Sequence, residues 1–374
     1  MKLVLAPDKF KNSLSALQFC KAVEAGIKEI YPQADIVKLP LADGGDGTIK
    51  VIKYYLKAEF VNIEVHNPFF EKISASYLFS EASKTAFIEM AEASGLKLLH
   101  QNSLDCKNTT TLGTGDLIVD ALNRDAKTII LGLGGSATND CGIGMATALG
   151  YRFLDKNNNE VKPIGAHLSQ IKTVDASKIH PRLKQVNFQI ACDVENPLCG
   201  ERGAVHTYAA QKGAAESDLI MLEQGMKDFS RILEASYDVE VQKVKGAGAA
   251  GGMGIASKLF LNGSLMPGIQ LLKSIADFDA KITNADWIIT GEGKLDIQTL
   301  SGKSIRGVLD SAKAKKIKVA ALCGAVDLDE IELKDFGIPY SDAVLRHAEN
   351  LSDAMKHAFE YVQLMAKNFA KNKL

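Results

Sequence analysis

Short apolar runs alternate along this chain with segments of helical spacing. The run 3–6 is followed by 13–30, where apolar residues recur three and four positions apart, which predicts an amphipathic helix capped by Ser13 or Ser15. A second apolar run, 36–39, completes a strand–helix–strand unit. Because such a unit joins parallel strands, the N-terminal segment predicts a parallel sheet.

The C-terminal part of the chain repeats this pattern. Apolar runs at 287–290, 319–323 and 343–345 predict strands, with one helix over 303–313 and a last helix from Leu351. Two N-terminal and three C-terminal strands can form one five-stranded, doubly wound parallel sheet. The middle of the chain is then an insertion into this sheet domain.

The middle of the chain has a different pattern. Runs at 61–65, 74–79 and 86–89, separated by short turns, predict antiparallel strands. Further strands are predicted over 128–131 and 186–191, and helices over 112–123 and 216–236. We therefore expect an α/β protein of two domains. Residues 1–60 and 283–374 form the doubly wound domain, and residues 61–282 form an inserted mixed α/β domain.

Composition narrows the class of protein. The 374 residues suffice for two domains, and 44 basic against 45 acidic residues leave no global field for nucleic acid or an anionic membrane. The six cysteines form no C-x-x-C pair, so a disulfide framework or a structural zinc is not expected. The N-terminal residues do not resemble a signal peptide, and no apolar segment approaches a membrane-spanning length. We expect a soluble cytoplasmic protein.

Five of the predicted strands end in loops that are acidic or rich in glycine. Ligands of open α/β sheets bind at the carboxyl ends of strands, so five such loops in two domains predict one cleft between the domains. Those loops span 7–11, 43–48, 132–140, 192–197 and 290–296.

The last of these loops combines glycines, carboxylates and a lysine, which favours phosphoryl transfer. Glu292, Lys294 and Asp296 supply the charges. The downstream Gly302-Lys303-Ser304 triplet is not a P-loop, because Ile297 occupies the position where that motif needs a glycine. Taken alone, the triplet is typical of a solvated helix start.

The glycine-rich segment 132–144 has three interpretations. It approaches the Rossmann fingerprint through Gly132-x-Gly134-x-x-Ala137, with Asp155 near the place of the ribose-binding acid. It also resembles the glycine–serine phosphate loop of GHMP-type kinases. The third interpretation is a tight turn whose glycines serve packing only. For the second small-residue tract, 246–254, close packing is the favoured role, with ligand approach and a hinge as alternatives.

Asp193, Glu195 and Asn196 follow a predicted interior strand and offer oxygen ligands. Mg²⁺ prefers one or two carboxylates together with phosphate oxygens and water, so Asp193 is a candidate metal ligand. It is equally a candidate base that takes a proton from a substrate hydroxyl, or a simple turn residue. The seven histidines do not cluster.

Together, nine segments resemble the type I glycerate kinase family, in order and across the chain. They are APDKFKNSLSA (6–16), PLADGGDGT (40–48), EMAEASGL (89–96), TTTLGTGDLI (109–118), GLGGSATNDCGIGM (132–145), CDVENPLCG (192–200), QKGA (211–214), GAGAAGGMG (246–254) and TGEGKLDIQTLSGKS (290–304). The resemblance implies ATP-dependent phosphorylation of D-glycerate, to 2-phosphoglycerate or 3-phosphoglycerate. It also implies a flavodoxin-like domain and a domain resembling a restriction-enzyme fold, and it argues against the Rossmann and GHMP analogies.

Within this resemblance the working assignment of site residues is as follows. Asp193, Lys294 and Lys9 are the catalytic candidates, and Asp193, Glu292 and Asp296 are the candidate ligands of Mg²⁺. Lys9 and Lys294 depart from the family pattern, in which Ser and Arg are common. Substrate or phosphate contacts are expected from Asp8, Asp43, Gly44, Gly45, Gly134, Gly135, Ser136, Asn139, Arg202, Gly291, Ser301 and Lys303.

Two alternatives stay open beside this assignment. The chain could phosphorylate another small hydroxy acid, or it could bind a metabolite without catalysis. The density of carboxylates and lysines favours an enzyme, because a binder of an anion needs few carboxylates. D-glycerate and ATP are the expected partners, and the assembly state, including a homo-oligomer, is left open.

Overall fold

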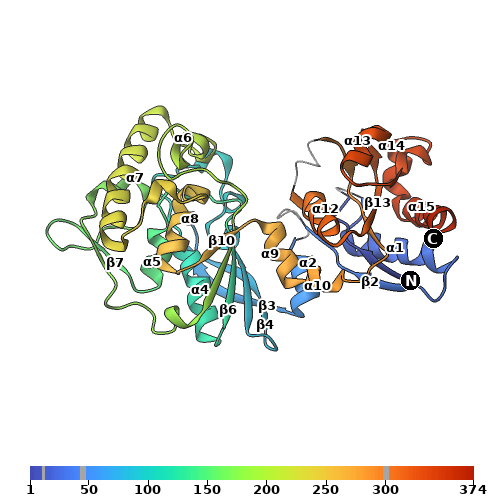
Figure 1. The fold of residues 1–374 in the computed structure, drawn as a ribbon. Helices are drawn as coiled ribbons and strands as arrows, with labels where there is room; N and C mark the ends of the chain where they lie inside the picture. Colours follow the sequence, from blue (N-terminus) through green and yellow to red (C-terminus); the bar gives the residue numbers. More distant parts are fainter. Residues whose placement is uncertain (11–12, 43–47, 298–302) are drawn as a thin grey trace. The chain divides into compact units, whose positions relative to one another are not determined.

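The computed structural model describes residues 1–10, 13–42, 48–297 and 303–374, without the side chains of Asn102 and Lys303. The chain divides into two compact units. Unit 1 comprises Met1–Tyr55 with Gly268–Leu374, and unit 2 comprises Leu56–Pro267. Residues 268–282, expected in the inserted domain, group with unit 1, and residues 56–60, expected in the doubly wound domain, group with unit 2. The N- and C-terminal segments, blue and red in Figure 1, therefore belong to the same unit.

Unit 1 contains one five-stranded sheet with the strand order β15-β13-β11-β1-β2, and every neighbouring pair is parallel. This confirms the prediction that two N-terminal and three C-terminal strands share a sheet. The strands are β1 (Lys2–Leu5), β2 (Asp35–Lys38), β11 (Trp287–Thr290), β13 (Lys318–Cys323) and β15 (Tyr340–Ala343). The last strand lies earlier than the predicted 343–345, because the apolar run continues past the strand end into a 3₁₀ turn, Val344–Arg346, in which only Val344 is buried.

Helices lie on both faces of this sheet. On one face, α1 (Ala16–Lys28) packs against α15 (Ala358–Lys373), and their apolar side chains join Leu3, Leu5 and Ile289 in one core cluster. Ser15 caps α1, since its hydroxyl accepts from the backbone N–H of Gln18 while Gln18 accepts from the backbone N–H of Ser15. On the other face, α12 (Lys303–Lys315) packs against β11 and β13. The remaining helices are α2 (Thr48–Leu56), α9 (Gly268–Ile275), α10 (Phe278–Lys281), α13 (Glu330–Asp335) and α14 (Leu351–Lys356).

Unit 2 contains a six-stranded mixed sheet with the order β10-β9-β6-β5-β4-β3. The pairs β3–β4 and β4–β5 are antiparallel, as predicted, whereas β5–β6, β6–β9 and β9–β10 are parallel. The parallel half brings the carboxyl ends of β6 and β9 to one edge of the sheet. The strands are β3 (Glu59–His66), β4 (Lys72–Ser80), β5 (Thr85–Glu89), β6 (Thr128–Gly132), β9 (Asn187–Ala191) and β10 (Ser264–Met266).

The helices of unit 2 enclose a single large apolar cluster, to which β4, β5, β6 and β9 contribute. Helix α4 has the predicted bounds, and α7 ends one residue later than predicted. The helices are α3 (Ala91–Ser94), α4 (Leu112–Asn123), α5 (Ile143–Ala148), α6 (Ala204–Tyr208), α7 (Glu216–Tyr237) and α8 (Ala249–Phe260). Two small pairs of strands complete the description: β7 (Arg152–Leu154) with β8 (Thr173–Asp175) in unit 2, and β12 (Lys294–Leu295) with β14 (Ala325–Val326) in unit 1.

Candidate active site

The loop that follows β6 forms a turn whose backbone is held from one side. Leu96 N–H donates to the carbonyl of Gly135 (2.9 Å), and Ala137 N–H donates to the carbonyl of Ser94 (2.9 Å). Gly135 has a φ of +72°, a conformation that glycine adopts without strain. Among the described residues, no protein group accepts from the N–H groups of Gly134, Gly135 or Ser136. Gly134 and Gly135 are exposed, so this turn can offer backbone donors to an anion.

A buried lysine stabilises this turn through two hydrogen bonds. Lys212 is only 3% exposed, and its ammonium donates to the hydroxyl of Ser136 (2.6 Å) and to the carbonyl of Thr138 (2.8 Å). Burial lowers the pKa of Lys212 to about 8, against a smaller opposing effect of nearby Cys106 and Asp140. The sequence interpretation missed the role of Lys212, although the residue lies within the QKGA segment that carried the family resemblance.

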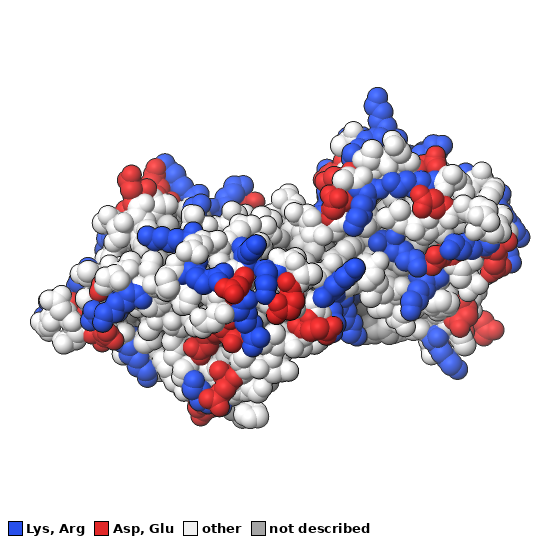
Figure 2. Space-filling model, turned by 90° about the horizontal axis from the view of Figure 1, so that it is seen from below, with Lys and Arg blue, Asp and Glu red and all other residues white. Residues whose placement is uncertain are grey.

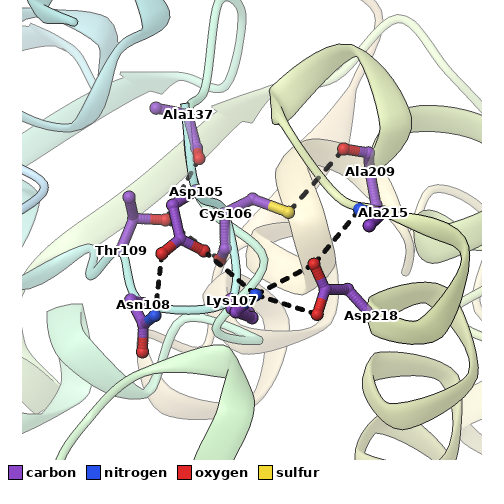
Figure 3. A network of polar contacts seen from close by, with 9 residues as sticks. All are labelled: Asp105, Cys106, Lys107, Asn108, Thr109, Ala137, Ala209, Ala215 and Asp218. Carbon is purple, nitrogen blue, oxygen red and sulfur yellow. Dashed lines mark hydrogen bonds and ion pairs between the residues drawn. The ribbon is translucent and has the colours of Figure 1, made fainter. Parts of the chain in front are cut away.

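The segment that packs beside Lys212 is fixed by its own polar contacts, shown in Figure 3. Lys107 donates to both carboxylate oxygens of Asp218 on α7 (2.9 and 3.0 Å), and Thr109 donates to the carbonyl of Ala137 (3.1 Å). Cys106 N–H donates to the carbonyl of Lys212 (3.1 Å). These contacts tie the glycine-rich loop, the Lys212 segment and α7 into one framework.

Asp140 closes the same loop with a carboxylate that is fully buried. It accepts hydrogen bonds from the backbone and hydroxyl of Thr111 (2.8 Å each) and from the backbone N–H groups of Gly142 (3.1 Å) and Gly144 (3.2 Å). Burial raises the pKa of Asp140, and these hydrogen bonds oppose the rise. Since Asp140 occupies the N-terminus of α5, this end is not open to a phosphate in the manner of a Rossmann loop. Asp155, the other part of that interpretation, accepts from the backbone N–H groups of a local turn.

Asn139 and the tract 246–254 belong to the packing of this loop. Asn139 is fully buried, and neither its side-chain nitrogen nor its oxygen has a partner among the described residues. Gly251 has a φ of +70°, and a Cβ there would lie 2.2 Å from the carbonyl oxygen of Thr138. Only glycine permits this approach, so the favoured role of the tract as a close-packing element is confirmed.

The loop after β9 carries Asp193 at the carboxyl end of the neighbouring parallel strand. Asp193 is partly exposed. Glu195 is exposed and pairs with Lys245 at 3.2 Å, and Asn196 donates to the carbonyl of Arg202 at 2.7 Å. Glu195 and Asn196 therefore engage local partners, and the exposed Arg202 lies on the stretch of chain that Asn196 holds. The structure thus brings the 134–136 turn and the Asp193 loop to the ends of two adjacent strands.

In unit 1, the loops after β1 and β11 also lie at adjacent strand ends. Asp8 N–H donates to the carbonyl of Gly291 (2.9 Å), and a carboxylate oxygen of Asp8 accepts from Lys9 N–H (2.6 Å). Asp8 is buried and Lys9 is half-buried. A Cβ on Gly291 would lie 2.0 Å from the carbonyl oxygen of Leu322, so this glycine serves the packing of β11 against β13. This arrangement places the acidic loop after β11 directly beside the β1 loop.

Lys294 is the most exposed charge of the β11 loop. Its side chain is 55% exposed and forms ion pairs with Asp327 (2.7 Å) and Asp296 (3.5 Å). The hydrogen bond from Lys294 to Asp327 is the main cause of a raised Lys294 pKa, so the ammonium stays charged at neutral pH. Asp327 was not predicted as a site residue, although it follows the predicted strand 319–323 closely enough for its place to be inferred. Glu292 is half-buried on the same loop, and its carbonyl accepts from Gly324 N–H (3.0 Å).

Some predicted residues lie outside the description. Asp43, Gly44, Gly45 and Ser301 fall in the undescribed stretches 43–47 and 298–302. Lys303 begins α12, but its side chain is not described. The structure leaves these predictions as they stand.

The surface and the acidic groups add two observations. Figure 2 shows basic and acidic side chains interspersed over the face that it displays. Within the described residues, no group of three or more His, Cys, Asp or Glu side chains is placed to hold a metal ion by itself. The same part of the chain contains no helix with the length and apolar character needed to cross a membrane.

Parallel sheets whose carboxyl edges carry glycine turns, carboxylates and lysines define an α/β protein with sites suited to an anionic small molecule. The family model described as "Glycerate kinase family" matches residues 3–373, so the chain belongs to the glycerate kinase family and is an enzyme of that family.

Relatives of known name match the chain over nearly its whole length. A glycerate kinase of Bacillus cereus is 42% identical and aligns with 99% of this chain and 97% of its own. A glycerate 2-kinase of Escherichia coli is 39% identical with the same coverage. A crystal structure of a candidate glycerate kinase 2 from Salmonella typhimurium LT2 superposes with a TM-score of 0.88 at 38% identity, covering 99% of this chain and 97% of that one.

Proposed function

We propose that the protein transfers the γ-phosphoryl group of ATP to the C2 hydroxyl of D-glycerate, which yields 2-phosphoglycerate and ADP. The observation that carries the proposal is the match of the whole chain to the glycerate kinase family. The choice of the C2 hydroxyl is supported by the relative from Escherichia coli that is named a glycerate 2-kinase. The two-domain description, with unit 1 as a flavodoxin-like domain, is part of this proposal and is supported by the 2-1-3-4-5 strand order of unit 1. A restriction-enzyme-like fold for unit 2 likewise stays a proposal.

The loops of unit 1 supply positive charge for the phosphates. Lys294 keeps its proton because Asp327 and Asp296 pair with it, and its exposure leaves the ammonium accessible to a ligand. A phosphate oxygen that approaches Lys294 competes with these carboxylates for the same proton donors. Lys9, at the neighbouring strand end, is the second candidate cation. Phosphoryl transfer depends mainly on positioning and on such neutralisation of charge.

The loops of unit 2 supply a donor turn and a base. The backbone N–H groups of Gly134, Gly135 and Ser136 point to an anion site that Lys212 holds in shape from below. Asp193 takes the proton of the attacking hydroxyl as the glycerate oxygen bonds to phosphorus, a role that typically contributes about 10²–10⁴-fold to the rate. Arg202, which is exposed and lies in the same loop region, is the candidate partner of the glycerate carboxylate.

The donor set fits Mg²⁺ bound together with ATP. Glu292 and Asp296 bring two carboxylates to one loop, and Asp193 is the alternative ligand; Mg²⁺ requires only one or two carboxylates when phosphates complete its shell. The bound ion would supply additional neutralisation of charge on the phosphates. Lys294 lies 3.5 Å from Asp296, so a phosphate that binds Lys294 would lie close to this candidate ligand of Mg²⁺.

A coupled assay of ADP release tests the proposal. The whole protein is incubated with ATP and, in separate reactions, D-glycerate, L-glycerate, tartronate and homoserine. We expect ADP release to be fastest with D-glycerate. Preference for another acceptor would overturn the substrate assignment, and stabilisation by D-glycerate without ADP release would show a metabolite-binding protein instead.

A further inference from the structure

Unit 1 contains a cavity of about 260 Å³ at the carboxyl edge of its parallel sheet. Its walls come from the segments that follow β1, β11, β13 and β15, and from α14 and α15. The strand order reverses between β1 and β11, because the chain leaves β1 toward β2 on one side and continues through β11 toward β15 on the other. Open α/β sheets bind ligands at this edge and near such a switch point.

The lining of the cavity is almost entirely apolar. Phe10, Val344 and Ala354 form buried walls, whereas Leu345, Leu351 and Met355 stand at the opening with exposed fractions of 42%, 63% and 40%. Apolar side chains gathered around a concave site mark a place where a ligand covers them. The ring of Phe10 packs against the ring of Phe19, with ring centroids 5.4 Å apart, so the Phe10 ring forms a fixed wall of the cavity.

Of the proposed reactants, only the purine base of ATP suits apolar walls. Glycerate and the triphosphate are small and strongly hydrated anions. Burial of either against aliphatic side chains would remove its hydration without providing compensating hydrogen bonds. The purine base is flat and weakly polar. A water molecule takes up about 30 Å³ in the liquid, so a cavity of this size suits one bicyclic ring system rather than a whole nucleotide.

The polar side of the cavity agrees with this choice. Lys294 is part of the lining, together with the backbone of Gly293 and Gly324. The side chain of Lys294 therefore supplies a cation at the border of an otherwise apolar cavity. The pocket backbone is already paired in part, since Ala325 N–H donates to the carbonyl of Gly293 and Leu345 N–H donates to the carbonyl of Gly324. Recognition by apolar contact with the ring faces then favours purines as a class.

We propose that this cavity receives the purine base of the phosphoryl-donor nucleotide, with Lys294 at its rim facing the phosphates; the inference rests on the proposed kinase function. Apolar contact distinguishes ligands by size and shape, so we expect purine nucleoside triphosphates to be used better than pyrimidine ones by about tenfold or more.

The direct test separates the base from the phosphates. Ligand-observed NMR titrations measure the affinity of the whole protein for adenosine and, separately, for inorganic tripolyphosphate. Ala354→Leu fills the cavity from its wall, and Lys356→Leu places the same side chain at an exposed position of α14 as the matched control. We expect Ala354→Leu to weaken adenosine binding about tenfold or more, with tripolyphosphate binding unchanged within about twofold and Lys356→Leu like the parent protein.

A second variant covers the case in which Ala354→Leu does not fold. Met355→Ala removes an exposed wall, and we expect it to weaken adenosine binding about threefold or more. Equal adenosine binding by the parent protein and Met355→Ala, or no adenosine binding by the parent, overturns the pocket assignment. If D-glycerate is phosphorylated normally by both variants, the kinase proposal stands and the pocket fails. If adenosine binds here but glycerate is not phosphorylated, the pocket stands and the kinase proposal fails.

Discussion

The glycine-containing loops of unit 1 and of unit 2 hold their charges in opposite ways. In unit 2, Lys212 and Asp140 are buried; Lys212 donates hydrogen bonds to Ser136 and Thr138, and Asp140 accepts hydrogen bonds from Thr111. In unit 1, Lys294 and its partners Asp296 and Asp327 are at least partly exposed and form ion pairs at the surface. The first arrangement fixes a backbone shape, and the second presents charge to solvent.

This difference separates stability from activity. Removal of a buried, hydrogen-bonded charge leaves its partners unsatisfied and costs several kcal/mol, whereas exposed ion pairs contribute about 0–1 kcal/mol. Substitutions around Lys212 and Asp140 should therefore act mainly on folding. Substitutions at Lys294 should act on ligand binding with little effect on folding.

Asp193→Asn should have the largest effect on turnover. It tests the separation of stability from activity, because Asp193 belongs to unit 2 but is partly exposed. Loss of the proposed base should lower kcat by about 10²–10⁴-fold. The melting temperature of Asp193→Asn should stay within a few degrees of that of the parent protein. The matched control on the same loop is Glu195→Gln, which removes only an exposed ion pair with Lys245. Near-parent kcat for Asp193→Asn would remove Asp193 from the catalytic assignment.

Asp140→Ala should have the largest effect on stability. Four hydrogen bonds to a fully buried carboxylate are lost, so we expect the free energy of unfolding to fall by about 3 kcal/mol or more. Urea unfolding followed by circular dichroism measures the change. The control is Asp155→Ala, which removes a carboxylate that also accepts from backbone N–H groups, but on an exposed turn, and should lower the free energy of unfolding much less. Equal costs for the two variants would contradict the contrast between buried and exposed groups.

Lys212→Met tests the contrast between buried and exposed charges through the pH dependence of stability. The folded protein releases the Lys212 proton near pH 8 and the unfolded chain near 10.5, so the unfolded state binds more protons between these values. The contribution of this group therefore makes stability rise from about pH 8 to about pH 10.5, by up to about 3 kcal/mol. In urea unfolding across this range, Lys212→Met should lose that rise relative to the parent.

Lys107→Met serves as the comparison within the same framework. The hydrogen bond from Lys107 to Asp218 raises the pKa of this partly exposed lysine. Its contribution to stability is therefore present at neutral pH and is lost as the pH rises above 10.5, which is opposite in sign to that of Lys212. If stability depended on pH in the same way in Lys107→Met and Lys212→Met, burial would not explain the difference between these two lysines.

Lys294→Met should have the smallest effect on folding and a moderate effect on binding. We expect the KM for ATP to rise about tenfold, because one accessible cation near the phosphates is lost, while the free energy of unfolding changes little. Lys294→Arg keeps the charge and should restore most of the affinity for ATP. Steady-state kinetics with both variants decide the point. An unchanged KM in Lys294→Met would show that Lys294 does not bind the phosphates of ATP.

The sequence predicted the sheet of unit 1 well because β1, β11 and β13 are short, largely apolar runs followed by glycine or acidic residues, as in residues 287–293. The strand after residue 339 was misplaced, because Val344 is as buried in a turn as it would be in a strand. Lys212 was missed as a supporting residue, since no local pattern distinguishes a buried lysine from an exposed one. Its role depends on Ser136 and Thr138, which are distant in sequence. The apolar cavity was likewise beyond prediction, because its walls come from segments that only the fold brings together.

Phosphorus NMR of the product formed from D-glycerate and ATP tests the proposed reaction most directly. A phosphate on C2 couples to one carbon-bound proton and gives a doublet in the proton-coupled spectrum, whereas a phosphate on C3 couples to two and gives a triplet. We predict a new phosphomonoester doublet that grows in step with ADP. A triplet would move the reaction to the C3 hydroxyl, and an unchanged ATP spectrum would contradict the proposed kinase activity.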